Sequence, residues 1–354
     1  MPISKINNAG LGTIDQINTG VTGYSFGAGN ASLMKNRILN GAMVIDQRNA
    51  GASVSCTSST YSCDRWLAYA QQTSKMTAQQ NAGSVTPPVG FSNYLGITSS
   101  SAYTVLTGDI FGLIQRIEGF NFADLNWGTA NAKTITLSFW AYSSLTGTFG
   151  GSLQNSASNR SYPFTYSIPV ANTWTQLAIT IAGDTTGTWV GATNGVGLQL
   201  TIGLGVGATY SGTAGSWAGA TYYSATGATS VVGTNGATFY ITGVQLEVGS
   251  SATGFEYVNY QTSLANCQRY YETQYIRSNG YWAGGSNAPV MFPMKASKRA
   301  TPTLTIGSDP SGWTSNITSS SDSSYDLNSA SVSVIPASTG SWRFGAICNL
   351  SAEL

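Results

Sequence analysis

The sequence contains no histidine and only four cysteines. Without an imidazole side chain, Ser–His and Cys–His nucleophilic catalysis and most zinc and iron catalysis are excluded. No Cys-x-x-Cys motif is present either, so a zinc site is not expected. Cys56 and Cys63 are close enough to pair across a short loop, whereas four unpaired thiols acting as small apolar residues are the simpler interpretation.

Charge is scarce as well. The 15 Lys and Arg residues and the 14 Asp and Glu residues make up 8% of the chain and leave a formal net charge of +1. Nucleic-acid binding requires a basic field that this composition does not supply, so nucleic acid is not an expected partner. Low charge combined with many small polar residues favours a permanent oligomer whose subunits meet over neutral surfaces.

Long apolar runs are missing. No segment reaches the run of about 18 apolar residues that a membrane span requires. The first twenty residues, MPISKINNAGLGTIDQINTG, lack the apolar core of a signal peptide. We therefore expect no membrane insertion, and a protein that is made in a cytoplasm and leaves it by a route other than secretion.

The acidic residues do not suggest an enzyme. Glycoside hydrolysis needs only two carboxylates at a suitable separation, so it is the reaction that this composition still permits. The acids of the central region form no recognisable doublet; they are Asp46, Asp64, Asp109, Glu118, Asp124, Asp184, Glu247 and Glu256. Asp46 and Asp64 each lie beside an arginine in sequence, which indicates structural pairing. We expect a non-enzymatic protein.

The sequence is rich in glycine, in small polar residues and in aromatic residues. It has 42 Gly, 9 Trp, 19 Tyr and 12 Phe, and 42% of the residues are hydrophobic. Aromatic and β-branched residues separated by turn residues favour short strands, and the apolar content is sufficient for a folded core. The composition therefore predicts an all-β protein.

Three regions differ in their pattern. Residues 1–35 are rich in Gly and Asn and are either a flexible leader or an arm that becomes ordered against a partner. Residues 36–258 contain repeated strand-like runs, which predict a jelly-roll β-sandwich. The expected strands are Arg37–Ile45, Ser74–Gln80, Leu113–Phe120, Thr134–Tyr142, Pro163–Ile168, Trp174–Ala182, Gly197–Leu204 and Ala237–Glu247. Within Thr134–Trp140 polar and apolar residues alternate, which predicts one face in a core and the other in water.

Residues 259–354 are expected to form a second, smaller β domain. Ser263–Tyr271 has the pattern of a short helix, and Asp309–Asp326 is predicted to be a surface loop. The expected strands are Val290–Met294, Thr303–Ile306, Ser331–Ile335 and Ser341–Asn349.

Six segments, taken in order, resemble a known group of proteins. They are Asn36–Asn49, Tyr61–Trp66, Gln115–Phe120, Thr136–Trp140, Phe239–Gly249, and Phe255–Tyr257 leading to Cys267–Tyr271. The series resembles phage and prophage tail-fibre-like virion proteins that carry a domain similar to carbohydrate-binding jelly rolls. It covers roughly residues 36–275 of the chain. The resemblance implies a place on the virion, a trimeric or other symmetric assembly, and contact with host surface glycans.

Two functions are consistent with this resemblance. The first is a tail fibre or receptor-binding protein, a homotrimer that is assembled in the host cytoplasm and held to other virion proteins by residues 1–35. Its jelly roll would form the body, and its C-terminal domain would be distal and contact host surface polysaccharide. The alternative is a capsid decoration, cement or head-fibre protein that stabilises the phage head. The absence of a repetitive shaft favours this alternative.

Glycan recognition requires aromatic faces and a few amide or carboxylate groups. The candidates in and before the Gly-rich stretch Thr209–Asn235 are Trp189, Asn194, Tyr210, Trp217, Tyr222 and Tyr223. These residues either contact glycan or fill an interface between subunits, and the same two alternatives apply to Tyr281, Trp282 and Trp313.

The other conspicuous residues are expected to be structural. Trp66 is predicted to pack under a sheet edge, Arg65 to pair with a carboxylate or cap carbonyls, and Arg116 to pair with Glu118 on one strand face. A calcium ion bound by Asp46, Glu118 or Glu247 together with backbone carbonyls would suit a jelly roll. No other cofactor is expected.

Overall fold

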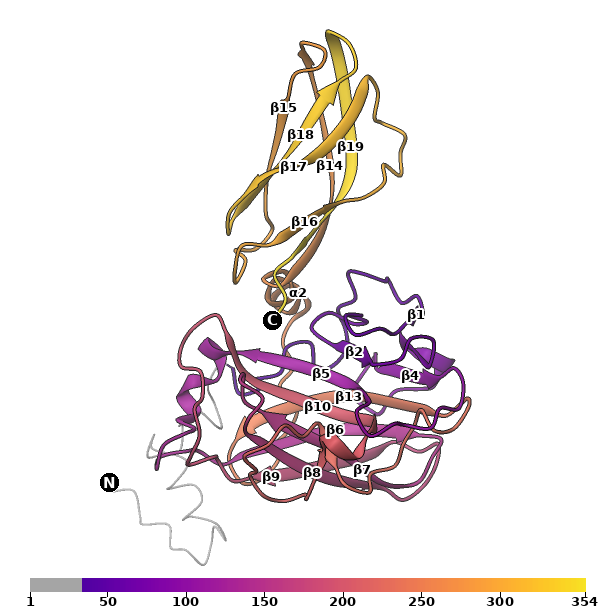
Figure 1. Ribbon diagram of the computed structural model, residues 1–354, viewed down its shortest axis with the longest axis vertical. Coiled ribbons are helices and arrows are strands. Elements are labelled where there is room, and N and C mark those ends of the chain that lie inside the picture. Colours follow the sequence, from indigo (N-terminus) through magenta and orange to yellow (C-terminus); the bar gives the residue numbers. More distant parts are fainter. Residues whose placement is uncertain (1–33) are drawn as a thin grey trace, which may run out of the picture.

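The computed structural model describes residues 34–354, and these form two β-sandwiches joined at the helix α2 (Tyr260–Gln268). The larger sandwich precedes α2 and the smaller one follows it, projecting from the larger one along the long axis of the molecule (Figure 1). The two have separate hydrophobic cores. The arm predicted for residues 1–35 lies outside the described residues, apart from Met34 and Lys35.

The larger sandwich consists of two antiparallel sheets packed face to face. The six-stranded sheet has the order β1 (Val54–Ser55), β3 (Met76–Gln80), β4 (Leu95–Ser99), β13 (Thr238–Val248), β6 (Ile135–Ser143), β9 (Thr175–Ile181). The five-stranded sheet has the order β2 (Leu67–Ala70), β5 (Ile110–Glu118), β10 (Val196–Val206), β7 (Gly147–Gln154), β8 (Ser161–Ile168). Inward residues such as Leu113, Phe139 and Phe239 form the core. The predicted jelly-roll sandwich is confirmed.

Short elements line the rims and faces of this sandwich. They are the 3-10 turns η2 (Ala82–Ser84), η3 (Gly119–Asn121), η4 (Ala123–Leu125) and η5 (Ala208–Tyr210), and a small parallel pair, β11 (Ser211–Gly212) with β12 (Ser224–Ala225). None of the described helices has the length and apolarity that crossing a bilayer demands.

Strand β6 differs from its prediction on one face. Ile135, Leu137 and Phe139 point into the core as expected, but Thr136 and Ser138 on the other face are also buried. The reason is that β6 is an inner strand whose outer face is covered by other segments. The Thr136 hydroxyl, for example, donates a 2.9 Å hydrogen bond to the carbonyl of Gly249. The alternation of apolar and polar residues along β6 therefore distinguishes the face in the core from a covered outer face. It does not distinguish the core from water.

The strand predicted at Arg37–Ile45 is wrong, because this segment is a series of turns. Asn40 and Met43 have positive φ values of 54° and 57°, which a strand does not allow. The Asn40 side chain accepts from the Ile45 amide at 3.0 Å and donates to the Ile45 carbonyl at 2.9 Å. These side-chain bonds replace the partners that a neighbouring strand would provide.

Strand β7 was not predicted because three of its first five residues are glycine. The fold requires at least one of them, since a Cβ built on Gly150 would lie 2.5 Å from the Ser224 hydroxyl oxygen. Ser224 belongs to β12, which packs over this sheet. Glycine at this position lets a covering segment approach the strand closely.

The smaller sandwich has two three-stranded sheets. One has the order β14 (Tyr271–Trp282), β19 (Gly340–Ser351), β16 (Thr303–Ile306), and the other β15 (Ala288–Pro293), β18 (Ser329–Pro336), β17 (Ile317–Tyr325). The surface loop predicted at Asp309–Asp326 is partly wrong, because β17 occupies half of it. β17 is an edge strand of mostly exposed serines, and such a polar edge lacks the apolar alternation by which strands are recognised.

Candidate functional site

Two of the six predicted glycan-binding residues, Trp189 and Trp217, belong to an aromatic cluster at the edge of the larger sandwich. Their ring centroids lie 5.5 Å apart, and both pack edge-on against Trp127 at 4.9 and 5.1 Å. The Trp189 Nε1–H donates to Asp184, and the Trp217 Nε1–H donates to the carbonyl of Ala182. Both indoles are half-buried against the core, so they anchor loops.

The three candidate tyrosines lie in a segment that covers the outer face of the five-stranded sheet. Tyr210 and Tyr223 pack edge-to-face at 5.6 Å, and Tyr222 lies against Gly212. The amide of Tyr222 donates to the hydroxyl of Ser161 on β8 at 3.2 Å. All three rings are half-buried.

Asn194 is exposed, and its amide donates at 2.7 Å to the carbonyl of Arg299 in the C-terminal region. The six predicted residues therefore have separate partners within the molecule. They do not present one aromatic face to solvent.

The three predicted calcium ligands are not brought together. Asp46 accepts from the amides of Asn49 and Gly51, Glu247 accepts from Gln245 and Thr253, and Glu118 accepts from Arg269 and Tyr270. Within residues 34–354 no three His, Cys, Asp or Glu side chains form a group that could hold a metal ion. Protein donors occupy the carboxylate oxygens that the prediction assigned to calcium.

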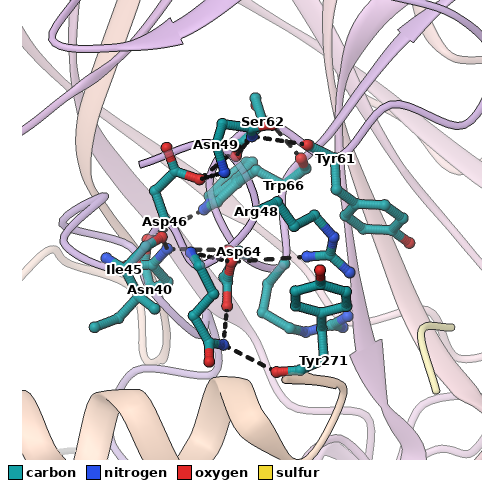
Figure 2. A network of polar contacts seen from close by, with 12 residues as sticks. Asn40, Ile45, Asp46, Arg48, Asn49, Tyr61, Ser62, Asp64, Trp66 and Tyr271 are labelled. Carbon is teal, nitrogen blue, oxygen red and sulfur yellow. Dashed lines mark hydrogen bonds and ion pairs between the residues drawn. The ribbon is translucent and has the colours of Figure 1, made fainter. Parts of the chain in front are cut away.

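Asp46 belongs to a polar network that also contains Asp64 and connects the two sandwiches (Figure 2). Asp64 is 1% exposed and accepts from the amide of Gln47 at 3.0 Å, while Arg48 lies 3.7 Å away. The Arg48 guanidinium stacks on the ring of Tyr271 at 3.6 Å and pairs with Glu353 at 3.0 Å. Residues from the start of the larger sandwich thus bind the first and last residues of the smaller one.

We call these contacts between the two sandwiches the joint, and Arg65 lies at its centre. It is 2% exposed, forms an ion pair with Glu353, donates to the carbonyl of Arg116 at 2.6 Å and stacks on Tyr270 at 3.7 Å. Because burial disfavours the charged form, the pKa of Arg65 is lowered from its ordinary value. The predicted pairing of Arg65 with a carboxylate is confirmed, and so is the burial of Trp66.

The predicted Arg116–Glu118 pair is wrong. Arg116 donates to Gln199, its neighbour in register on β10, at 2.9 Å. Glu118 accepts from Arg269 at 2.6 Å and from the Tyr270 hydroxyl at 2.6 Å. Burial acts to raise the pKa of Glu118, but these hydrogen bonds outweigh it and hold the pKa below its ordinary value. These partners of Glu118 come from the segment after α2, so the sequence pattern of β5 alone could not predict them.

Four of the segments that carry the tail-fibre resemblance meet at this joint. Asn36–Asn49, Tyr61–Trp66, Gln115–Phe120 and Cys267–Tyr271 all contribute side chains to the contacts just described. Their distinctive Arg, Asp, Trp and Tyr residues are buried or paired there. The motif residues therefore hold the two sandwiches together and leave little free to bind a ligand.

A cavity of about 630 Å³ lies beside the joint. Its walls are mostly apolar, but Glu118 and Glu256 both line it. Glu256 accepts the amide of Asn36 at 2.6 Å, and Glu118 is held in its charged form as described above. A glycosidase acid needs a raised pKa, which Glu118 does not have.

The exposed outer face of the smaller sandwich differs from all of these sites. Tyr275, Arg277, Asn279 and Tyr281 alternate along β14 and point away from the core, while Arg343 lies beside Asn279 on β19. Trp313, from the loop between β16 and β17, packs over this sheet. We call these six residues the Trp313 face.

Aromatic and cationic side chains are stacked within the Trp313 face. The guanidinium groups of Arg277 and Arg343 lie 5.3 and 4.8 Å from the centre of the Trp313 ring, and Arg277 also lies 4.9 Å from the Tyr275 ring. Tyr281 is 71% exposed. The face therefore presents aromatic surface, two guanidinium groups and an amide to solvent.

Asp309 positions one edge of the Trp313 face. Its carboxylate accepts from the Tyr275 hydroxyl at 2.7 Å and from the amide of Thr314 at 2.6 Å. The Tyr275 hydrogen bond is the main reason that the pKa of Asp309 lies well below its ordinary value. Tyr281 and Trp313 were candidates from the sequence, whereas the other four residues of the face were not. The signal was the alternation of large residues in Tyr275–Tyr281, a strand that was not predicted.

Comparisons with known proteins give likenesses of fold. No family model and no curated protein sequence matches the chain. A putative sugar binding protein from Bacteroides thetaiotaomicron is 12% identical, with 60% of this chain and 100% of that one covered and a TM-score of 0.34. A family 11 carbohydrate-binding module from Clostridium thermocellum is 10% identical, with 58% and 100% covered and a TM-score of 0.28.

A viral protein is also among the similar structures. The triple jelly-roll protein of an archaeal virus turret is 12% identical, with 73% of this chain and 59% of that one covered and a TM-score of 0.19. At these identities and TM-scores the likenesses concern the jelly-roll fold and assign no ligand to this chain.

Proposed function

We propose that the chain is a non-enzymatic attachment protein of a phage particle, with the larger sandwich as its body and the smaller sandwich as its glycan-binding part. The observation that carries this proposal is the Trp313 face. It is a solvent-exposed surface of aromatic rings, guanidinium groups and an amide on a sheet that projects from the body (Figure 1).

The chemistry of this face suits a sugar. Aromatic rings such as Trp313 and Tyr281 offer apolar surfaces for the C–H faces of a pyranose. Asn279, Arg277 and Arg343 offer donors and an acceptor for hydroxyl groups. The face is open and shallow, so we expect each contact to be weak and the affinity to come from several copies acting together.

A homotrimer with residues 1–35 joined to other virion proteins would provide those copies. Support comes from the tail-fibre resemblance and from exposed apolar side chains around the cavity, which are Met34, Phe120, Tyr257 and Val258. Such a group of apolar side chains is typical of a protein–protein interface. Native mass spectrometry of the full chain should give a trimer, and Phe120→Asp should weaken it. A monomeric wild-type protein would contradict this part of the proposal.

The contacts of the two acids that line the cavity, Glu118 and Glu256, support the proposal of a non-enzymatic role. Glu118 is ionised by its partners, and Glu256 accepts a backbone amide at 2.6 Å. Prolonged incubation with host polysaccharide should release no reducing ends. Release that Glu118→Gln abolishes would instead show a hydrolase.

Binding of purified host surface polysaccharide to the immobilised protein tests the main proposal. Trp313→Ala and Tyr281→Ala should each weaken binding by about fivefold or more, the loss expected for one aromatic contact. Tyr260→Ala is the matched control, because Tyr260 is 55% exposed but lies on α2. Equal binding by all four proteins would contradict a role for this face.

The place of the protein on the virion can be tested separately. A label on the smaller sandwich, imaged on intact particles by electron microscopy, should gather at the tail. Label spread over the head would contradict tail attachment and favour the alternative of capsid decoration, for which raised heat resistance of empty capsids is the next measurement.

A further inference from the structure

The Trp313 face holds two positive charges that contact one indole ring. Arg277 and Arg343 come from neighbouring strands, and both guanidinium groups stack on the same indole ring, at 5.3 and 4.8 Å from its centre. Like charges that share one site repel each other, so the arrangement favours an anion that binds to both.

No carboxylate of the described chain neutralises either guanidinium group. Within residues 34–354 neither Arg277 nor Arg343 forms an ion pair, and neither side chain donates a hydrogen bond to a protein acceptor. The other arginines differ: Arg160, for instance, forms two hydrogen bonds with Asp184. The two arginines of the face therefore keep their full donor capacity for a ligand.

The nearby acid is already engaged. Asp309 accepts from the Tyr275 hydroxyl, from the Ser311 amide and from the Thr314 amide. These bonds fix the loop that carries Trp313. The indole Nε1–H of Trp313 is itself buried and has no acceptor among the described residues.

We infer that the Trp313 face binds an acidic glycan, with the carboxylate of one sugar unit lying between Arg277 and Arg343. The planar guanidinium fork matches the two oxygens of a carboxylate. Trp313 and Tyr281 would stack on the neighbouring sugar rings. This inference rests on the proposed function and adds to it the charge class of the ligand.

The test compares matched pairs of polymers on the full chain. Polygalacturonate, hyaluronan and polysialic acid are each measured against their own carboxyl-reduced forms, and dextran sulfate is measured against dextran. At least one of the three acidic polymers should bind about tenfold more tightly than its reduced form. Raising the salt concentration from about 0.05 M to about 0.5 M should remove most of that difference, because exposed charges are screened.

Variants then assign the preference to residues. Arg277→Gln combined with Arg343→Gln should abolish the preference for the acidic form. Lys133→Gln, which removes one partly exposed positive charge from the larger sandwich, is the matched control and should leave the preference intact. Thermal unfolding should be the same for all of these variants, because both arginines of the face are exposed.

The possible failures are distinguishable. Equal binding of acidic and reduced polymers that is still lost in Trp313→Ala would overturn the acidic ligand and leave the attachment function standing. Dextran sulfate binding as tightly as the best carboxylated polymer, and with the same arginine dependence, would overturn the assignment of a carboxylate. Binding of no polymer and of no host polysaccharide would overturn both.

Discussion

The two sandwiches differ in how far the outer faces of their sheets are covered. In the larger one the chain covers its own sheets: β12 packs over β7, β8 and β10, and on the six-stranded sheet Tyr142 stacks on the buried Tyr240. In the smaller one, the outer face of β14 and β19 is covered in part by Trp313 and exposes Arg277 and Tyr281. Sheets closed on both faces suit a body, whereas a sheet with an open aromatic face suits recognition.

Charge is distributed in the same contrasting way. At the joint, Arg65 and Asp64 are buried, Arg48 is half-buried, and all three are paired, so they fix one geometry between the sandwiches. On the Trp313 face, arginines of the same kind are exposed and unpaired within the described chain. The same residue type is therefore structural in one region and available to a ligand in the other.

The largest expected effect comes from breaking the joint. Arg65→Met removes the cation that pairs with Glu353 and leaves that carboxylate and the Arg116 carbonyl without this partner. Removing one member of a buried pair costs about 3–5 kcal/mol, because the other charge stays buried. We expect a free energy of unfolding lower by that amount in urea titrations.

The control for Arg65→Met is Arg343→Met. This substitution removes an exposed arginine and should change the free energy of unfolding by less than about 0.5 kcal/mol. If the two substitutions had equal effects, the distinction between a buried joint and an open face would be wrong.

A smaller loss of stability is expected at the aromatic cluster. Trp217→Ala removes a half-buried indole that packs against Trp127 and Trp189, and should cost about 2–3 kcal/mol, less than a fully buried tryptophan. Glycan binding should not change. The reverse result, a stable protein that no longer binds glycan, would restore Trp217 as a glycan-binding residue and would argue against the Trp313 face.

How far the sequence predicted this architecture depends on where the partners of each residue lie. Strand β10 was recognised because its own apolar residues mark it, and the two-sandwich class followed from many such strands. Arg37–Ile45 was misread because its partners are Asn side chains that close turns. The position of Glu118 against Arg269 depends on a contact across 151 residues. Local patterns carry no information on such pairs.

The candidate site was harder to predict for a related reason. Trp189, Trp217 and Tyr223 have the composition of a glycan site, but whether an aromatic ring is exposed is decided by which segment folds over it. Tyr281 and Trp313 were considered with the same two alternatives. Only the register of β14 with β19 shows that Arg277 and Arg343 lie beside one indole.

A pH-dependent effect is expected at Glu118. Its folded-state pKa lies below the ordinary 4.5, so the unfolded state takes up the proton first as the pH falls. The stabilisation is therefore fully present above about pH 4.5 and is lost as the pH falls through the folded pKa. Glu118→Gln should lower the free energy of unfolding at neutral pH by about 1.5–3 kcal/mol, the range for hydrogen bonds to a charged group. The difference in free energy of unfolding between variant and wild type should become smaller in acid. A difference that does not change with pH would contradict the ion pair with Arg269.

The smallest effect on the native protein is expected from the thiols. They also give the sharpest test of the comparison between the two sandwiches. Cys56, Cys63, Cys267 and Cys348 are all buried and unpaired, and burial raises the pKa of Cys56 to about 12 and that of Cys348 to about 11. In native buffer a thiol reagent should therefore label none of them, and reductant should leave the melting temperature unchanged.

In increasing urea, labelling becomes a separate report on each sandwich, because Cys56 lies in the larger core and Cys348 in the smaller one. If the joint couples the two regions, both thiols should react over one shared transition in the wild-type protein. In Arg65→Met the two transitions should separate, since the ion pair between Arg65 and Glu353 no longer links the two sandwiches. Separate transitions already in the wild type would show that the buried network aligns the two sandwiches but that they unfold independently.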